Sequence, residues 1–180
     1  GPLLVLGGTP GLGGAAHLAT RAALRAGAGL VTAAAPAAAL ADIKSGWPEI
    51  MTLALTGPGA YQWPDMLEEE LRKLCARCTA LVVGPGMGRG EDAARFLDAL
   101  LALPQVFDAD ALMLLARRPA LLEQLTERDI LVPHPGEAAA LLACATGEIQ
   151  AARAAALTRL CSRCAGVVVL KGAGTLVGQS

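Results

Sequence analysis

The chain has 180 residues and a net charge of −1, from 15 Lys and Arg against 16 Asp and Glu. With no basic block and only 3% aromatic residues, it lacks the cationic surface and the stacking side chains that nucleic-acid-binding proteins use. Its longest uncharged stretch, residues 26–41, is too short to span a bilayer, so we expect a cytoplasmic protein that binds neither nucleic acid nor membrane.

Short apolar runs alternate with helical patterns along the chain, and we expect them to form a single domain, residues 1–180. The predicted strands cover residues 3–6, 30–34, 49–55, 81–83, 106–107, 130–132 and 167–170. The predicted helices cover residues 15–26, 36–43, 65–78, 91–103, 111–116, 138–144 and 151–165. Because strands and helices alternate, the pattern predicts an α/β fold with a parallel sheet and helices on both of its faces.

A glycine-rich loop, residues 7–14, follows the first predicted strand. Gly11, Gly13 and Ala16 fit the dinucleotide-binding pattern G-x-G-x-x-A. That pattern requires an acidic residue about 20 residues later, at the end of the second strand, and residues 30–35 contain none. We therefore reject an ordinary Rossmann site, although the glycines can still let a polar ligand reach backbone amides at the start of a helix.

Five loops with unusual residues all follow predicted strands. They are residues 7–14, 84–88, 108–110, 133–137 and 171–175. Because the carboxyl ends of parallel strands lie at one edge of a sheet, where α/β proteins bind ligands, we expect these loops to form one large site. In the second loop, Gly86 can bring its backbone against a ligand because it has no Cβ, although a plain turn would use the same residues.

Residues 133–137 are the strongest candidate among these loops. Two prolines end the preceding strand, because neither can donate to the sheet, and between them lies His134, one of only two histidines in the chain. Glu137 is expected to open the next helix. A ligand site that uses His134 and Glu137, and a polar turn without a ligand, both explain this sequence.

Two aspartates follow the strand at residues 106–107. Asp108 and Asp110 alternate along the chain, so only one of them can face a common site. We expect the other to cap the helix at residues 111–116.

The last loop places a cation, backbone amides and a hydroxyl together. Its sequence is Lys171-Gly172-Ala173-Gly174-Thr175. It is not a Walker loop, since no glycine-rich run precedes the lysine. These groups suit a phosphate or a nucleotide, whereas a hairpin turn with a solvated lysine would need no ligand.

Four of the five cysteines form two CxxC units that each precede a predicted strand. Cys75 pairs in sequence with Cys78, and Cys161 with Cys164. The gap between the two units is far longer than the spacer of about 15–20 residues in a zinc ribbon. We therefore expect reduced, metal-free cysteines at the sheet edge opposite the candidate site.

Six segments, considered together, are more specific than any single loop. They are LLVLGGTPGLGGAAHLATRAALRAGAGLVTAAAP, PEIM, LVVGPGMG, VFDADAL, LVPHPGE and VVVLKGAGT. In sequence and in order they resemble the NAD(P)H-hydrate dehydratases of the ribokinase-like superfamily, over nearly the whole chain. The resemblance implies a three-layer α/β/α fold with a mostly parallel sheet. It also implies a metabolite-repair hydro-lyase that returns hydrated NADH or NADPH to the reduced cofactor, with ADP or ATP as co-substrate.

The resemblance also implies roles for individual residues. It places Ala15, Gly86 and His134 on the hydrated dinucleotide, and Glu137 near Mg²⁺ and the phosphates. The adenine nucleotide falls on Lys171, Gly172, Ala173, Gly174 and Thr175. Since the family is typically tetrameric, we expect a homotetramer, and we expect the chain to be fused to or paired with an NAD(P)H-hydrate epimerase domain.

In this family the LKGAGT strand is followed by a glycine-rich segment resembling GGTGD, whose amides form an anion hole and whose aspartate is the catalytic base. The sequence ends at Ser180, before such a segment, so we expect an incomplete domain that carries no identified catalytic residue. Two alternatives remain open. One is a small-molecule kinase of the same superfamily, such as a thiazole or sugar kinase, and the other is a non-catalytic nucleotide-binding or assembly module.

The sequence predicts that residues 1–180 alone lack dehydratase activity and that the chain extended through its natural continuation has it. Loss of oxyanion donors costs about 10²–10³ in rate per donor, and loss of a positioned base costs about 10²–10⁴. Recovery of NADH absorbance from its hydrate with ADP measures both proteins. Normal turnover by residues 1–180 would show that the base is misassigned and would make Asp108 or Asp110 the next candidate.

Overall fold

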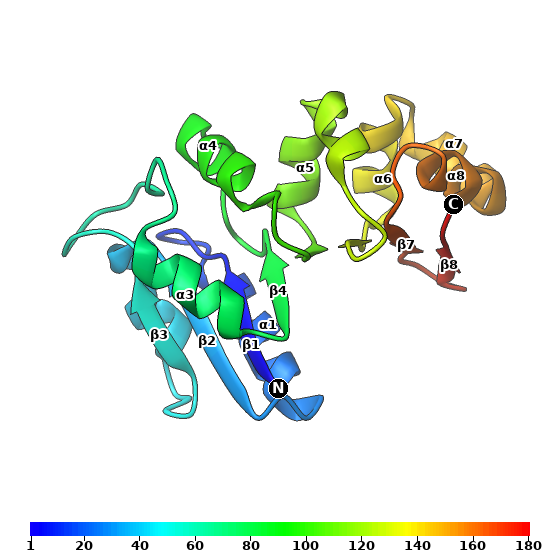
Figure 1. Ribbon diagram of the computed structural model, residues 1–180. Helices are drawn as coiled ribbons and strands as arrows, with labels where there is room; N and C mark the ends of the chain where they lie inside the picture. Colours follow the sequence, from blue (N-terminus) through cyan, green and yellow to red (C-terminus); the bar gives the residue numbers. More distant parts are fainter. The chain divides into compact units, whose positions relative to one another are not determined.

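The computed structural model describes residues 1–180, which form two compact units, Gly1–Leu103 (unit 1) and Pro104–Ser180 (unit 2) (Figure 1). In each unit mostly parallel strands alternate with helices, so the predicted α/β class is confirmed. None of the helices is long and apolar enough to cross a membrane. The expectation of a single domain stays a prediction.

Unit 1 is built on four parallel strands in the order β3-β2-β1-β4. Its strands are β1 Pro2–Leu6, β2 Leu30–Ala35, β3 Met51–Ala54 and β4 Ala80–Val83. Its helices are α1 Gly13–Arg25, the 3-10 helix η1 Ala37–Ala39, α2 Leu40–Lys44, α3 Glu69–Arg77 and α4 Glu91–Leu100. Helices α1 and α2 cover one face of the strands, and α3 lies across the other face (Figure 1).

Small and branched side chains form the core between α1, α2 and the sheet. Val5, Ala16 and Ala33 are fully buried at its centre. At the end of α1, the amide of Ala28 donates to the carbonyl of Ala23 (3.0 Å) while Gly27 adopts a φ of 96°. This backbone turn ends the helix at the glycine that the sequence marked as its stop.

Unit 2 contains three parallel strands followed by one antiparallel strand, in the order β5-β6-β7-β8. Its strands are β5 Val106–Phe107, β6 Ile130–Leu131, β7 Val167–Leu170 and β8 Leu176–Gly178. Its helices are α5 Asp110–Ala116, the 3-10 helix η2 Pro119–Gln124, α6 Pro135–Leu142, α7 Thr146–Ala151 and α8 Arg153–Cys161. These helices lie on one side of the strands (Figure 1).

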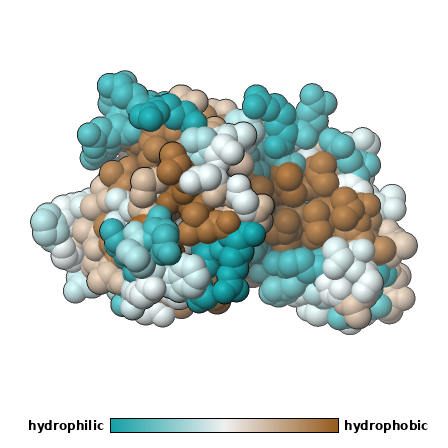
Figure 2. Space-filling view, turned by 90° about the horizontal axis from the view of Figure 1, so that it is seen from below, coloured by the Kyte–Doolittle hydropathy of each residue, from teal (hydrophilic) through white to brown (hydrophobic).

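The two faces of the unit 2 strands differ in burial. Phe107, Leu131 and Val168 share the face that the helices cover, and each is at most 1% exposed. The opposite face carries branched apolar side chains that are half-buried or exposed, namely Val106, Ile130, Val132, Val167, Val169 and Val177. Figure 2 shows apolar surface on this underside. Such a surface agrees with the expected self-association, which stays a prediction.

The start of α6 is the clearest difference from the predicted elements. The sequence predicted a helix over residues 138–144 that Glu137 opens, but α6 begins at Pro135 with His134 as its N-cap. Proline is tolerated at the first helical position because its missing N–H would have no partner there. The helix α7 and the strand β8 were also not predicted from the sequence.

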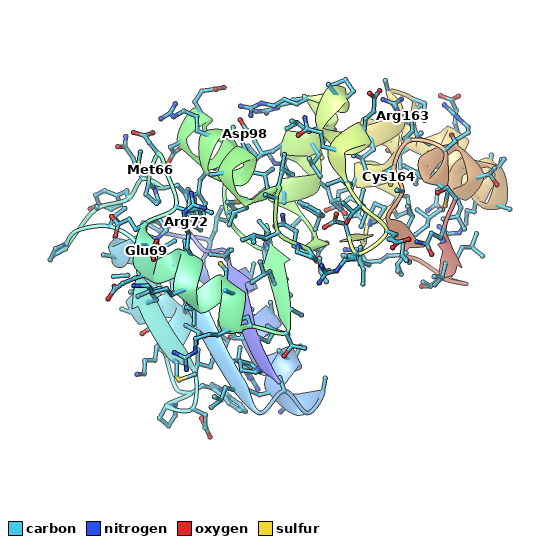
Figure 3. The ribbon with its side chains drawn as sticks, viewed as in Figure 1. Met66, Glu69, Arg72, Asp98, Arg163 and Cys164 are labelled. Carbon is cyan, nitrogen blue, oxygen red and sulfur yellow. The ribbon has the colours of Figure 1, made fainter.

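Each CxxC unit lies at the end of a helix. Cys75 is in α3 and Cys78 follows it, while Cys161 ends α8 and Cys164 comes just before β7 (Cys164 is labelled in Figure 3). Burial raises the pKa of all four thiols. For Cys75 the pKa is raised from 9.0 to about 11, through burial and then through the neighbouring Cys78.

Cys75 is therefore expected to be among the slowest cysteines to be alkylated in the folded protein. A pKa raised from 9.0 to about 11 lowers the thiolate fraction near pH 8 by about 100-fold. Iodoacetamide labelling with peptide mass spectrometry should modify the half-buried Cys144 first, and the Cys75 rate should keep rising with pH up to about 11. The control is the same reaction in denaturant, where all five thiols should react alike. Equal rates for Cys75 and Cys144 near pH 8 in the folded protein would contradict this burial.

Candidate functional site

The loop after β6 is closed by reciprocal contacts between His134 and Glu137. Nδ1 of His134 accepts hydrogen bonds from the amides of Gly136 (2.9 Å) and Glu137 (3.3 Å), and Oε2 of Glu137 accepts one from the amide of His134 (2.7 Å). This capping box satisfies the first amides of α6. Because Nδ1 is an acceptor, the proton of the neutral ring is assigned to Nε2, which lies 3.3 Å from Oε1 of Glu137. Nδ1 is thus engaged and Nε2 lies beside the Glu137 carboxylate, while the side chain stays 56% exposed.

Three strand ends of unit 2 meet at the ammonium group of Lys171. Its Nζ lies 2.6 Å from Oδ1 of Asp108, which follows β5, and 3.8 Å from Oε2 of Glu137, which follows β6. The backbone amide of Lys171 also donates to the carbonyl of Pro133 (2.8 Å). The predicted convergence is confirmed for these three loops of unit 2. One ammonium lies between two carboxylates, and the Glu137 carboxylate is only 7% exposed.

The geometry of Glu137 does not fit a direct ligand for Mg²⁺. One of its oxygens accepts the His134 amide at 2.7 Å, and the position between Glu137 and Asp108 is taken by the ammonium of Lys171. No group of three His, Cys, Asp or Glu side chains is arranged to hold a metal ion. The expectation of Mg²⁺ near the phosphates stays a prediction.

The turn after β5 adopts an unusual backbone conformation. Ala109 has a φ of 51° and a ψ of −118°, which residues with a side chain seldom adopt. Its amide donates to Oδ1 of Asp108 (2.8 Å), the atom that also contacts Lys171. The expectation that one aspartate caps the next helix is wrong. Ala109 holds the N-cap position, Asp108 faces Lys171, and Asp110 is the first residue of α5, where its negative charge suits the helix dipole.

The loop of residues 171–175 connects β7 to the antiparallel strand β8, and residues 172–175 are exposed. The amides of residues 172–174 donate no hydrogen bond within the chain. Gly172 and Gly174 have positive φ angles of 143° and 68°. Unengaged backbone amides in a turn can donate to an anion. The hairpin of the alternative interpretation is therefore present, but its lysine is paired with Asp108 and not simply solvated.

In unit 1 the two glycine-rich loops, residues 7–14 and 84–88, contact each other. The hydroxyl of Thr9 donates to the carbonyl of Gly86 (3.2 Å). A Cβ on Gly86 would lie 2.3 Å from the carbonyl oxygen of Leu12, so no other residue fits there without moving that loop. The predicted convergence of these two loops is confirmed within unit 1.

Ala15 and Gly86 differ in accessibility. Ala15 is exposed in the first turn of α1, whereas Gly86 is buried under the neighbouring loop. The need for a glycine at position 86 is therefore explained by the close packing of the loop that contains Leu12. Contact of either residue with a dinucleotide stays a prediction.

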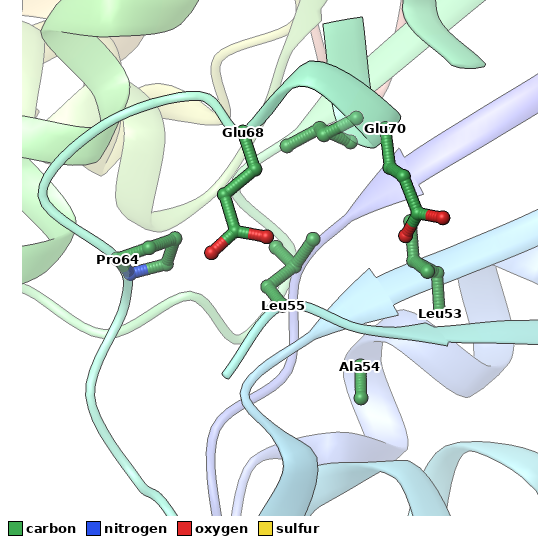
Figure 4. A pocket seen from close by; sticks show the side chains of 7 residues that line it. Leu53, Ala54, Leu55, Pro64, Glu68 and Glu70 are labelled. Carbon is green, nitrogen blue, oxygen red and sulfur yellow. The ribbon is translucent and has the colours of Figure 1, made fainter. Parts of the chain in front are cut away.

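A small pocket in unit 1 contains none of the predicted site residues (Figure 4). It lies between the end of β3 and the start of α3, and Leu55, Pro64 and Glu68 are among its lining residues. Its volume of about 10 Å³ gives room for about one water molecule. It is therefore too small to hold a nucleotide.

Two features of the unit 2 cluster were absent from the sequence prediction. Lys171 and Asp108 are 63 residues apart, and no motif joins them. Arg153, the first residue of α8, donates to main-chain carbonyls of residues 170, 171 and 174. No sequence signal marks this arginine, because its loop partners are backbone atoms, which every residue carries.

Relatives identify the family of the chain. A family model described as NAD(P)H-hydrate dehydratase matches residues 3–179. The chain is 39% identical over 179 residues to the bifunctional NAD(P)H-hydrate repair enzyme Nnr of Coxiella burnetii, and 39% identical to that of Escherichia coli. These matches cover 98% of this chain but 34% and 32% of those proteins, so the chain spans about a third of their length.

Solved structures show the same fold. An ADP/ATP-dependent NAD(P)H-hydrate dehydratase from Bacillus subtilis, co-crystallized with ATP/Mg²⁺ and soaked with CoA, has a TM-score of 0.72 and 26% identity. That match covers 99% of this chain and 62% of the other. A ribokinase-like superfamily protein from Enterococcus faecalis has a TM-score of 0.78 at 21% identity, over all of this chain and 60% of the other, and it supports the fold alone. The predicted ribokinase-like, three-layer α/β/α fold is confirmed.

Because the family match and relatives above 30% identity extend over almost all of its residues, this chain belongs to the NAD(P)H-hydrate dehydratase family.

Proposed function

We propose that the chain forms the nucleotide-dependent dehydratase part of an enzyme that returns hydrated NADH or NADPH to the reduced cofactor. The observation that carries this proposal is the Lys171 cluster beside the unengaged amides of residues 172–174. Family membership supports the same activity. Because the chain spans about a third of its curated relatives, the activity is proposed for the whole protein that contains it.

The proposed reaction uses ADP or ATP as a phosphoryl donor. The terminal phosphoryl group of ADP passes to the hydroxyl oxygen of the hydrate, the hydroxyl proton goes to a base, and AMP is left. Phosphate then leaves the nicotinamide ring as a neighbouring ring C–H loses its proton, which forms NADH or NADPH. Such chemistry depends mainly on positioning and on stabilising the charge of the phosphoryl group.

In unit 2, the amides of residues 172–174 are proposed to donate to the nucleotide phosphates. Lys171 already lies 2.6 Å from Asp108, so a phosphate oxygen would compete with that carboxylate for the ammonium group. Thr175 is the last residue of the loop, and its hydroxyl donates a hydrogen bond to the carbonyl of Gly172 (3.1 Å). Mg²⁺ is proposed to be carried by the phosphates and water, since Glu137 is engaged within the protein.

Ala15, Gly86 and His134 keep their proposed role as contacts of the hydrated dinucleotide. For His134, Nδ1 is engaged in the capping box and Nε2 lies 3.3 Å from Oε1 of Glu137. Its contact is therefore proposed to use the exposed face of the ring, which can stack on a planar group. A His134→Phe variant keeps such a face but loses the cap, and a His134→Asn variant keeps the cap but loses the face. Weaker dinucleotide binding by His134→Phe than by His134→Asn would contradict the stacking role.

The name of the curated relatives, bifunctional repair enzymes, supports a second catalytic domain in the whole protein. We propose an NAD(P)H-hydrate epimerase as that fused or paired domain, and a homotetramer as the assembly. Light scattering of the whole protein tests the assembly, and monomers at high concentration would contradict it.

The whole protein is expected to restore NADH from hydrated NADH only when ADP or ATP is present. Absorbance of the reduced nicotinamide measures the product. Chromatography measures phosphate and the spent nucleotide, AMP from ADP or ADP from ATP, which should form in equal amounts. Phosphorylation of an alcohol substrate without NADH formation would support a small-molecule kinase instead. Nucleotide binding without any turnover would support a non-catalytic module.

Lys171→Met is expected to lower kcat/KM for the nucleotide by about 10²–10³, the usual effect of removing one donor to the developing charge. The substitution also leaves Asp108 and the buried Glu137 without the cation between them. The matched control is Lys73→Met in unit 1, because the Lys73 side chain is 70% exposed and pairs with the equally exposed Glu69. Similar kinetics for the two variants would contradict the assigned role of Lys171.

A further inference from the structure

One guanidinium group holds the backbone of the loop that connects β7 to β8. Nη2 of Arg153 donates to the carbonyls of Leu170 (3.1 Å), Lys171 (3.3 Å) and Gly174 (3.3 Å). Nη1 lies 3.4 Å from the Lys171 carbonyl and 3.3 Å from Oε1 of Gln150, which fixes the group from the α7 side. Arg153 is the first residue of α8, so a rigid helix carries this contact.

The contacts of Arg153 divide the polar groups of the loop into engaged and unengaged sets. Arg153 donates hydrogen bonds to the carbonyls of residues 170, 171 and 174, and the Thr175 hydroxyl donates one to the carbonyl of Gly172. The amides of residues 172–174 have no partner within the chain. Four carbonyls at this loop, those of residues 170–172 and 174, are thus bound by the protein, while the amides of residues 172–174 remain for a ligand.

The charge of Arg153 has the sign that an anionic ligand requires. Its guanidinium contacts only carbonyl and amide oxygens and has no carboxylate partner. Charge-assisted hydrogen bonds of this kind are stronger than neutral ones. Lys171, by contrast, has its charge balanced by Asp108 at 2.6 Å. Arg153 is therefore the uncompensated cation that lies directly against the loop.

Gly172 fits the same arrangement. A Cβ at this position would lie 2.9 Å from Nη1 of Arg153, and its φ of 143° is one that other residues seldom adopt. The glycine lets the guanidinium approach the main chain from the protein side. The loop and the arginine are therefore packed against each other at Gly172.

We propose that Arg153 is a positioning residue for nucleotide binding: it binds the loop carbonyls and so presents the amides of residues 172–174 to the phosphates. This inference rests on the proposed function, in which that loop binds the adenine nucleotide. Arg153 does not touch the nucleotide itself. Its contribution is preorganisation, which lowers the cost of ordering the loop when the ligand binds.

The test compares Arg153→Met with Arg159→Met in the whole protein, each measured for the KM of ADP and the KM of hydrated NADH. Arg159 lies on the same helix and is exposed, so the two variants lose the same charge. Arg153→Met is expected to raise the KM for ADP about 10-fold or more, a loss similar to that caused by removing residues that orient the ligands of a metal site. The KM for hydrated NADH should stay unchanged. Calorimetric titration with ADP should show the same loss of affinity.

Arg153→Lys separates charge from geometry. It keeps the positive charge but loses the planar fork, so its ADP affinity should stay at least about 3-fold below that of the wild type. Complete recovery would overturn the carbonyl-binding role, as would Arg153→Met behaving like Arg159→Met or raising both KM values together. If Arg153→Met does not fold, Arg153→Gln takes its place. Wild-type protein that does not bind ADP would overturn the proposed function itself, which is a separate result.

Discussion

The carboxylate of Glu137 is the group on which the carboxyl edge of unit 2 depends. It is buried, and a buried carboxylate is costly unless hydrogen bonds and opposite charge compensate it. The amide of His134 and the ammonium of Lys171 supply both. The same carboxylate thereby contributes to the cap of α6 and contacts the lysine that follows β7. Asp108 then completes the cluster from β5, so one buried charge organises three loops.

A carbonyl oxygen repels a phosphate, so backbone amides bind an anion better when the neighbouring carbonyls are hydrogen-bonded to other groups. In this loop the Arg153 guanidinium on α8 binds the carbonyls of residues 170, 171 and 174, and the Thr175 hydroxyl binds that of Gly172. Asp108 lies 2.6 Å from Lys171, whereas Arg153 has only neutral partners, so Arg153 carries the less compensated positive charge beside the loop. The lysine of the LKGAGT motif thus joins strands as well as serving the proposed ligand.

The sequence predicted those parts of the fold that depend on local pattern. Apolar runs located β1, β4 and β7 within a residue or two, and Gly27 located the end of α1. It misplaced the start of α6, because Pro135 looks like a helix breaker until His134 is known to cap it. It could not find Arg153 or the pairing of Asp108 with Lys171, since these depend on contacts between residues far apart in the chain and partly on main-chain atoms. Family resemblance identified the loops but not the contacts that shape them.

The position of Lys171 also bears on how a metal could take part. An ammonium group between two carboxylates is a fixed single charge on a tethered side chain, and it leaves no space for a hydrated divalent ion between them. Mg²⁺ demands near-octahedral oxygen ligands and keeps several waters when it binds phosphates. Displacing Lys171 to make room would break its contacts with both carboxylates and leave the buried Glu137 without its cation. Under the proposed function, a metal already bound to the phosphates avoids that cost, so backbone amides would hold the nucleotide and the carboxylates would orient the lysine.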